Sequence, residues 1–153
     1  RVALIGRTGC GKSAFVNTLF RAATGKCGLA RISDFCEGTT RLDDFHLNAF
    51  PMIVADTRGL FLFDALETTE VTNIVQGKYQ SGDVVKRMRT DGIPVYDPDA
   101  PFRKQVHGVI FVVQSNDPCL RDSDQYYRPF RLFLSELGIE PVCVITHGDK
   151  LAA

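Results

Sequence analysis

The run GRTGCGKS fits the pattern GxxxxGK[ST] and consists of Gly6, Arg7, Thr8, Gly9, Cys10, Gly11, Lys12 and Ser13. An apolar run, Val2 to Ile5, precedes it, and apolar residues at helical spacing follow it from Ser13 to Ala23. Between a strand and a helix, the glycines let backbone N–H groups surround a phosphate group. We expect Lys12 to bridge the β- and γ-phosphates of a nucleotide and the Ser13 hydroxyl to bind magnesium.

Three further short apolar runs lie downstream, at Met52 to Ala55, Val109 to Val113 and Val142 to Ile145. Continuous β-branched runs of this length are typical of strands in a parallel sheet that helices cover on both faces. Residues 41–49 instead alternate apolar and polar side chains, which predicts an edge or antiparallel strand. The chain is therefore predicted to form a three-layer α/β fold whose mainly parallel sheet has one antiparallel edge strand.

The spacing of apolar residues also predicts a helix over Asp122 to Leu137, with Asp122 or Ser123 as its N-terminal cap. About forty residues separate Phe63 from the strand at Val109, more than one helix and its turns need. We therefore expect an insertion over about residues 64–105. Its first part, Leu66 to Val75, is predicted to be helical, and glycines and prolines make the remainder loop-rich.

Composition limits the classes of partner. With 153 residues, 44% hydrophobic, the chain is long enough to form one globular domain. Eighteen basic and eighteen acidic residues give no net charge, so no nucleic-acid partner is expected. No apolar run approaches the roughly twenty residues of a transmembrane helix. The cysteines lack the spacing of a zinc site or a disulfide framework, which favours a reducing, cytoplasmic location: Cys10, Cys27, Cys36, Cys119 and Cys143.

Two more motifs follow apolar runs. The first, Asp56-Thr57-Arg58-Gly59, begins 44 residues after Lys12. A carboxylate at this strand end can hold magnesium, and the Gly59 N–H can face a γ-phosphate. The second motif ends the last apolar run and reads Thr146-His147-Gly148-Asp149.

The order of these motifs resembles the G domain of P-loop GTPases over essentially the whole of residues 1–153. The resemblance implies that Thr40, in the sequence EGTTR of residues 37–41, closes over magnesium and the γ-phosphate. It also implies that Asp149 binds guanine. Thr146 and His147 replace the usual asparagine and lysine, and His147 can stack on the base. Against a standard G domain, we expect residues 1–153 to lack the last strand, the last helix and the fifth motif.

The expected ligands are therefore GTP or GDP with magnesium, and Lys12 and Thr40 are the expected catalytic residues. Many small GTPases carry a glutamine after the DxxG glycine to orient water, whereas this chain has Leu60. We expect slow hydrolysis, with a catalytic group from elsewhere in the chain, from a partner or from a second copy in a nucleotide-dependent dimer. Arg7 and Arg58 are candidates for positive charge near the phosphates.

Within the GTPases, the insertion and the TH-x-D form of the last motif resemble the interferon-induced protein 44 family and the AIG-type immunity-associated GTPases. A dynamin-like or septin-like placement stays open beside this resemblance. The expected role is a switch or nucleotide-dependent assembly. Two alternatives stay open: a P-loop ATPase or kinase-like enzyme, and an inactive module that binds nucleotide without turning it over.

Overall fold

The computed structural model describes residues 1–26, 30, 40–48, 50–61, 64–85, 102–120 and 123–149. Residues 37–39 before Thr40, the proposed cap Asp122 and most of the loop-rich part of the expected insertion lie outside the described residues. In the described part of the chain, no helix is both long and apolar enough to cross a membrane.

The described strands form one five-stranded sheet in the order β2-β3-β1-β4-β5. Four of these strands are mutually parallel: β1 (Val2–Ile5), β3 (Met52–Asp56), β4 (Gly108–Gln114) and β5 (Val142–Thr146). Strand β2 (Asp43–Leu47) pairs antiparallel with β3 and forms an edge of the sheet. The predicted α/β fold with a mainly parallel sheet and an antiparallel edge strand is thus confirmed.

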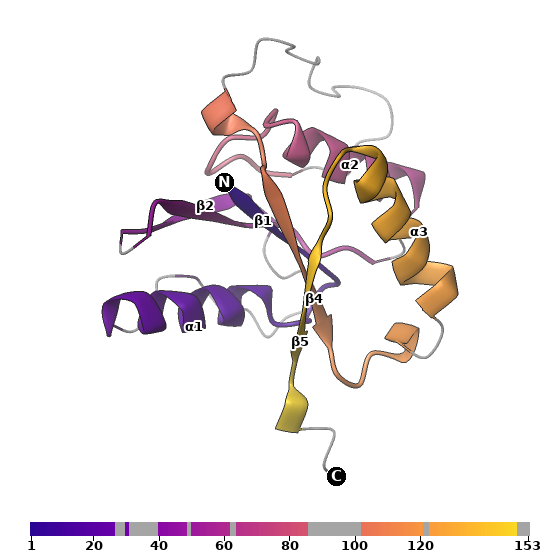
Figure 1. Cartoon of the computed structure of the whole chain (residues 1–153), viewed down its shortest axis with the longest axis horizontal. Helices are drawn as coiled ribbons and strands as arrows, with labels where there is room; N and C mark the ends of the chain where they lie inside the picture. Colours follow the sequence, from indigo (N-terminus) through magenta and orange to yellow (C-terminus); the bar gives the residue numbers. More distant parts are fainter. Residues whose placement is uncertain are drawn as a thin grey trace.

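Helices cover both faces of the sheet. Helix α1 (Lys12–Thr24) lies on one side, and α2 (Ala65–Val75) and α3 (Ser123–Glu136) lie on the other (Figure 1). Two short 3₁₀ helices, Phe102–Lys104 and Pro118–Leu120, flank β4. The three predicted helices are therefore present, each within one or two residues of its expected ends where these are described.

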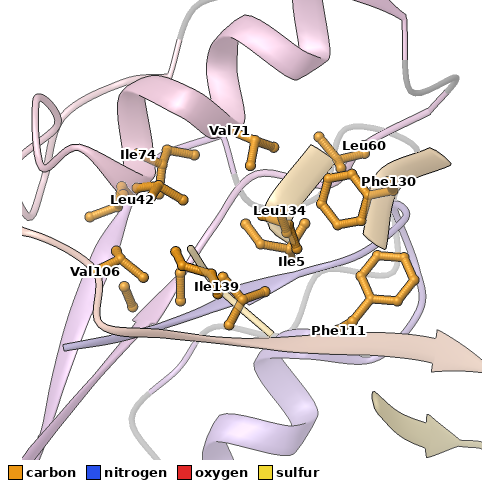
Figure 2. Packing of buried hydrophobic residues seen from close by; sticks show 14 of the residues in the cluster. Ile5, Leu42, Leu60, Val71, Ile74, Val106, Phe111, Phe130, Leu134 and Ile139 are labelled. Carbon is orange, nitrogen blue, oxygen red and sulfur yellow. The ribbon is translucent and has the colours of Figure 1, made fainter. Parts of the chain in front are cut away.

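Side chains alternate between two apolar clusters because successive residues of a strand face opposite sides. Ile5 of β1 and Phe111 of β4 pack with Val71 of α2 and Phe130 of α3 (Figure 2). Leu4, the residue before Ile5 in β1, points to the opposite face and packs in the second cluster, against α1. This packing fixes the three layers and brings the carboxyl ends of β1, β3, β4 and β5 to one edge of the sheet, where their loops meet.

Candidate functional site

The loop after β1 bends around the start of α1 as its glycines require. Gly9 and Gly11 have φ of 78° and 92°, in the left-handed region that side chains disfavour. Gly11 is the N-cap of α1 and provides no side-chain hydrogen bond to the first turn. The first N–H groups of the helix are therefore not capped by a side chain, and this arrangement suits an anion.

A second glycine requirement comes from close packing. A Cβ atom on Gly6 would lie 2.2 Å from the carbonyl oxygen of Val112 and 2.8 Å from Sγ of Cys10. Cys10 itself is buried, and burial raises the pKa of its thiol, so it fills space under the loop as an uncharged group. The loop thus lies directly against β4.

Lys12 lies across the loop that precedes it. Its side chain is buried, and Nζ donates to the carbonyl oxygens of Gly6 and Arg7, both at 3.1 Å. These partners are uncharged, and the nearby thiol of Cys10 stays protonated. The ammonium group is therefore held beside the uncapped helix start and adds positive charge to it.

Ser13 and Asp56, two of the predicted magnesium ligands, are in direct contact. Ser13 Oγ donates to Asp56 Oδ2 at 2.6 Å. The other carboxylate oxygen, Oδ1, is buried and has no hydrogen-bond partner among the described residues. Burial raises the pKa of Asp56, while the Ser13 hydrogen bond and the Lys12 charge oppose that rise. The Ser13 hydroxyl and the buried Asp56 carboxylate, with its Oδ1 unpartnered in the described part of the chain, are oxygen ligands that fit a hard divalent cation.

The DxxG loop pairs directly with the loop after β1. Thr8 N donates to Leu60 O and Leu60 N donates to Gly6 O, both at 3.0 Å. A Cβ atom on Gly59 would lie 2.4 Å from Thr8 Oγ1 and 2.5 Å from its Cα. Gly59 is therefore needed for the two loops to approach. Sequence reasoning did not predict this pairing. The signal in the sequence is an apolar residue, Leu60, directly after the polar DxxG motif, and the structure buries it.

The TH-x-D motif approaches the same loop from β5. Thr146 Oγ1 donates to Cys10 O at 2.6 Å, and a Cβ on Gly11 would lie 3.5 Å from His147 Cε1. His147 has a positive φ of 54°, unusual for a residue with a side chain. Asp149 is exposed just beyond it. Three of the four predicted motifs thus converge at one edge of the sheet.

Thr40, from the remaining motif, is half-buried, and its carbonyl oxygen accepts a hydrogen bond from Val85 N at 3.0 Å. This contact fixes the backbone of Thr40, and the binding of a metal by its side chain stays a prediction. Arg58, one of the two arginines expected near the phosphates, donates through Nη1 to Val85 O at 2.8 Å.

Sequence reasoning missed an ion pair beside the loop. Arg7 Nη1 lies 3.0 Å from Asp117 Oδ1, and Tyr127 donates to Asp117 Oδ2 at 3.3 Å. Asp117 follows β4 and Tyr127 lies on α3, and no spacing rule connects either with Arg7. A cavity of about 430 Å³ opens here, lined by residues 7, 8, 10, 60, 61, 114 and 116–118.

Comparison with known families agrees with this geometry. A family model described as "50S ribosome-binding GTPase" matches residues 1–135. The match includes the loop of residues 6–13 and the DxxG motif, while the TH-x-D motif lies beyond it. A comparison with curated proteins gave no match. The matched residues make up most of the chain, which therefore belongs to the 50S ribosome-binding GTPase family.

Proposed function

We propose that the protein binds GTP and GDP with magnesium at the loop of residues 6–13, hydrolyses GTP slowly and acts as a nucleotide-controlled switch. One observation carries the proposal: the start of α1 has no side-chain cap and is wrapped by a loop with two left-handed glycines. Such a helix end presents N–H groups and the positive end of the helix dipole to an anion. Buried Lys12 adds its charge at the same place.

Each residue of the site has its own task in this proposal. Lys12 exchanges the carbonyl oxygens of its loop for β- and γ-phosphate oxygens. Ser13 and Asp56 hold magnesium, which neutralises charge on the phosphates when it is bound. Thr40 closes over the same ion and the γ-phosphate, and Gly59 directs its N–H to that phosphate.

We infer that the base is guanine. The contact of Thr146 and His147 with the loop supports a nucleotide whose phosphates lie at α1 and whose base extends toward β5. There the Asp149 carboxylate accepts hydrogen bonds from guanine N1 and its exocyclic amine, and adenine has no such pair of donors.

A binding comparison of GTP with ATP tests the choice of base. We expect a preference for GTP of at least about tenfold, as the two hydrogen bonds to a charged acceptor supply. Asp149→Ala removes the preference, and the exposed Glu136→Ala retains it as a matched acidic control. Equal affinity of the unaltered protein for the two nucleotides would favour the ATPase or kinase alternative.

Slow hydrolysis follows from Leu60. This side chain is apolar, is 2% exposed and packs in the cluster between the sheet and α2, so it cannot orient a water molecule. A catalytic group from a second copy, in a nucleotide-dependent homodimer, would make phosphate release depend on protein concentration. Single-turnover release measured at low and high concentration separates this case from slow turnover by the monomer, and complete absence of release identifies an inactive binding module.

Two finer assignments belong to the same proposal. The insertion and the TH-x-D motif favour a place near the interferon-induced protein 44 and AIG-type GTPases. A reducing, cytoplasmic location is supported by Cys10 and Cys143, which are both free thiols. Measurement of nucleotide-dependent dimerisation by sedimentation tests the assembly role, and fractionation of cells tests the location.

A further inference from the structure

Part of the insertion lies along the segment that carries Thr40. Residues 81–85 extend antiparallel beside residues 40–44, which lead into the edge strand β2, with a bridge between Arg41 and Val84. Four hydrogen bonds join the two segments: Val85 N to Thr40 O at 3.0 Å, Leu42 N to Asp83 O at 3.0 Å, Gly82 N to Leu42 O at 2.7 Å and Asp44 N to Ser81 Oγ at 3.0 Å. Backbone pairing of this kind fixes register as well as position.

The same part of the insertion also holds the DxxG loop. The peptide N–H of Val85 donates to Thr40, and the carbonyl oxygen of Val85 accepts from the Arg58 guanidinium at 2.8 Å. A hydrogen bond with a charged donor is stronger than one between neutral groups. One residue of the insertion is therefore bonded on its two sides to two different motifs of the site.

Buried side chains reinforce this link. Leu42 lies two residues after Thr40, Leu60 directly follows the DxxG motif, and both pack with Val85 in one apolar cluster (Figure 2 labels Leu42 and Leu60). Val85 and Leu42 are 0% exposed and Leu60 is 2% exposed. Because such a core is densely packed, a displacement of one of these segments disturbs the packing of the others.

We propose that Val85 and Arg58 couple the Thr40 segment to the DxxG loop, so that the two respond to the γ-phosphate as one unit. Arg58 is then a positioning residue, acting through the backbone of Val85. The inference rests on the proposed function, since it assigns the insertion a part in distinguishing GTP from GDP. Coupling means that ordering one segment lowers the entropic cost of ordering the other, which raises affinity for the nucleotide that contacts both.

Arg58 variants test the coupling through the ratio of two affinities. We expect Arg58→Ala to weaken binding of a non-hydrolysable GTP analogue about tenfold and to leave GDP binding unchanged. The variant loses the charged hydrogen bond to Val85 O that couples the two segments, and only a nucleotide with a γ-phosphate contacts both of them. Arg58→Lys keeps a donor for the carbonyl oxygen and recovers part of the ratio. Arg131→Ala, an exposed arginine of α3, is the matched control and leaves both affinities unchanged.

Hydrogen exchange distinguishes positioning from direct contact of Arg58 with phosphate. In the unaltered protein, the Val85 amide is expected to exchange more slowly with the GTP analogue than with GDP, because its acceptor is the backbone of Thr40. Arg58→Ala removes this difference. If Arg58 only contacted phosphate, the variant would lose analogue affinity and keep the difference at Val85, which would overturn the coupling.

Three other outcomes would also overturn it. They are an unchanged affinity ratio in Arg58→Ala, an equal loss for both nucleotides, and a Val85 amide that exchanges alike in both nucleotide states. In all three, the unaltered protein still binds guanine nucleotide and the proposed function stands. Absence of guanine-nucleotide binding by the unaltered protein would overturn both. Thermal melting of each variant identifies any that fail to fold, and Arg58→Lys then carries the test.

Discussion

Replacement of Gly59 by alanine tests the contact between the DxxG loop and the loop of residues 6–13. The added Cβ would lie 2.4 Å from Oγ1, 2.5 Å from Cα and 2.7 Å from N of Thr8, and two of these atoms are backbone. The loops must separate, which strains or breaks the two hydrogen bonds through Leu60. Each bond contributes about 1 kcal/mol, and forced overpacking costs about 1–3 kcal/mol. We expect Gly59→Ala to lower the free energy of unfolding by about 2–4 kcal/mol.

Chemical denaturation and thermal melting of the nucleotide-free protein measure this loss. For a chain of this size, 1 kcal/mol corresponds to a Tm shift of about 2–4 °C, so Tm should fall by at least about 4 °C. Gly108→Ala is the matched control, because its Cβ would meet only Val2 Cγ2, at 3.9 Å. We expect that variant to stay within about 0.5 kcal/mol of the unaltered protein. Equal stability of the two variants would refute the close approach of the loops.

Three further predictions concern charge and packing. Asp56→Asn should stabilise the protein at pH 7 in the absence of nucleotide and metal. Because the pKa of Asp56 is raised in the folded state, the contribution of this group to stability is present at low pH and is lost as pH rises through the folded-state pKa. Denaturation measured from pH 3 to 8 should therefore show a weaker decline in stability for the variant than for the unaltered protein. Asp117→Ala should cost about 1–3 kcal/mol in urea denaturation, because it removes the partner of Arg7 and Tyr127, and no change would contradict the ion pair. Leu134 is 0% exposed, and Leu134→Ala should lower the free energy of unfolding by about 2–5 kcal/mol. Leu132, on the same helix, is 57% exposed, and Leu132→Ala should lower it by less than about 0.5 kcal/mol. Similar losses in the two variants would contradict the packing of α3.

Much of the site could be predicted because its residues follow local patterns. The loop of residues 6–13 has a fixed spacing, and Asp56 and Thr146 end strands whose apolar runs are recognisable. In a parallel sheet such ends meet at one edge, so Ser13 and Asp56 could be expected to lie together.

Contacts made by irregular segments could not be predicted in this way. Arg7 and Asp117 are 110 positions apart, and Arg58 and Val85 are 27 apart, with no periodicity between them. Val84 and Val85 follow a polar stretch and resemble an ordinary loop in sequence. Their pairing with residues 40–42 depends on how the chain leaves α2, which tertiary packing decides.

The most direct test of the phosphate site is calorimetric titration of GDP, with magnesium, into the unaltered protein, Lys12→Ala and Lys26→Ala. The last variant changes an exposed lysine just beyond α1 and controls for loss of charge. We predict binding by the unaltered protein and Lys26→Ala, and a loss of at least about tenfold in Lys12→Ala. GDP binding of equal strength to all three proteins would contradict the assignment of this loop to phosphate.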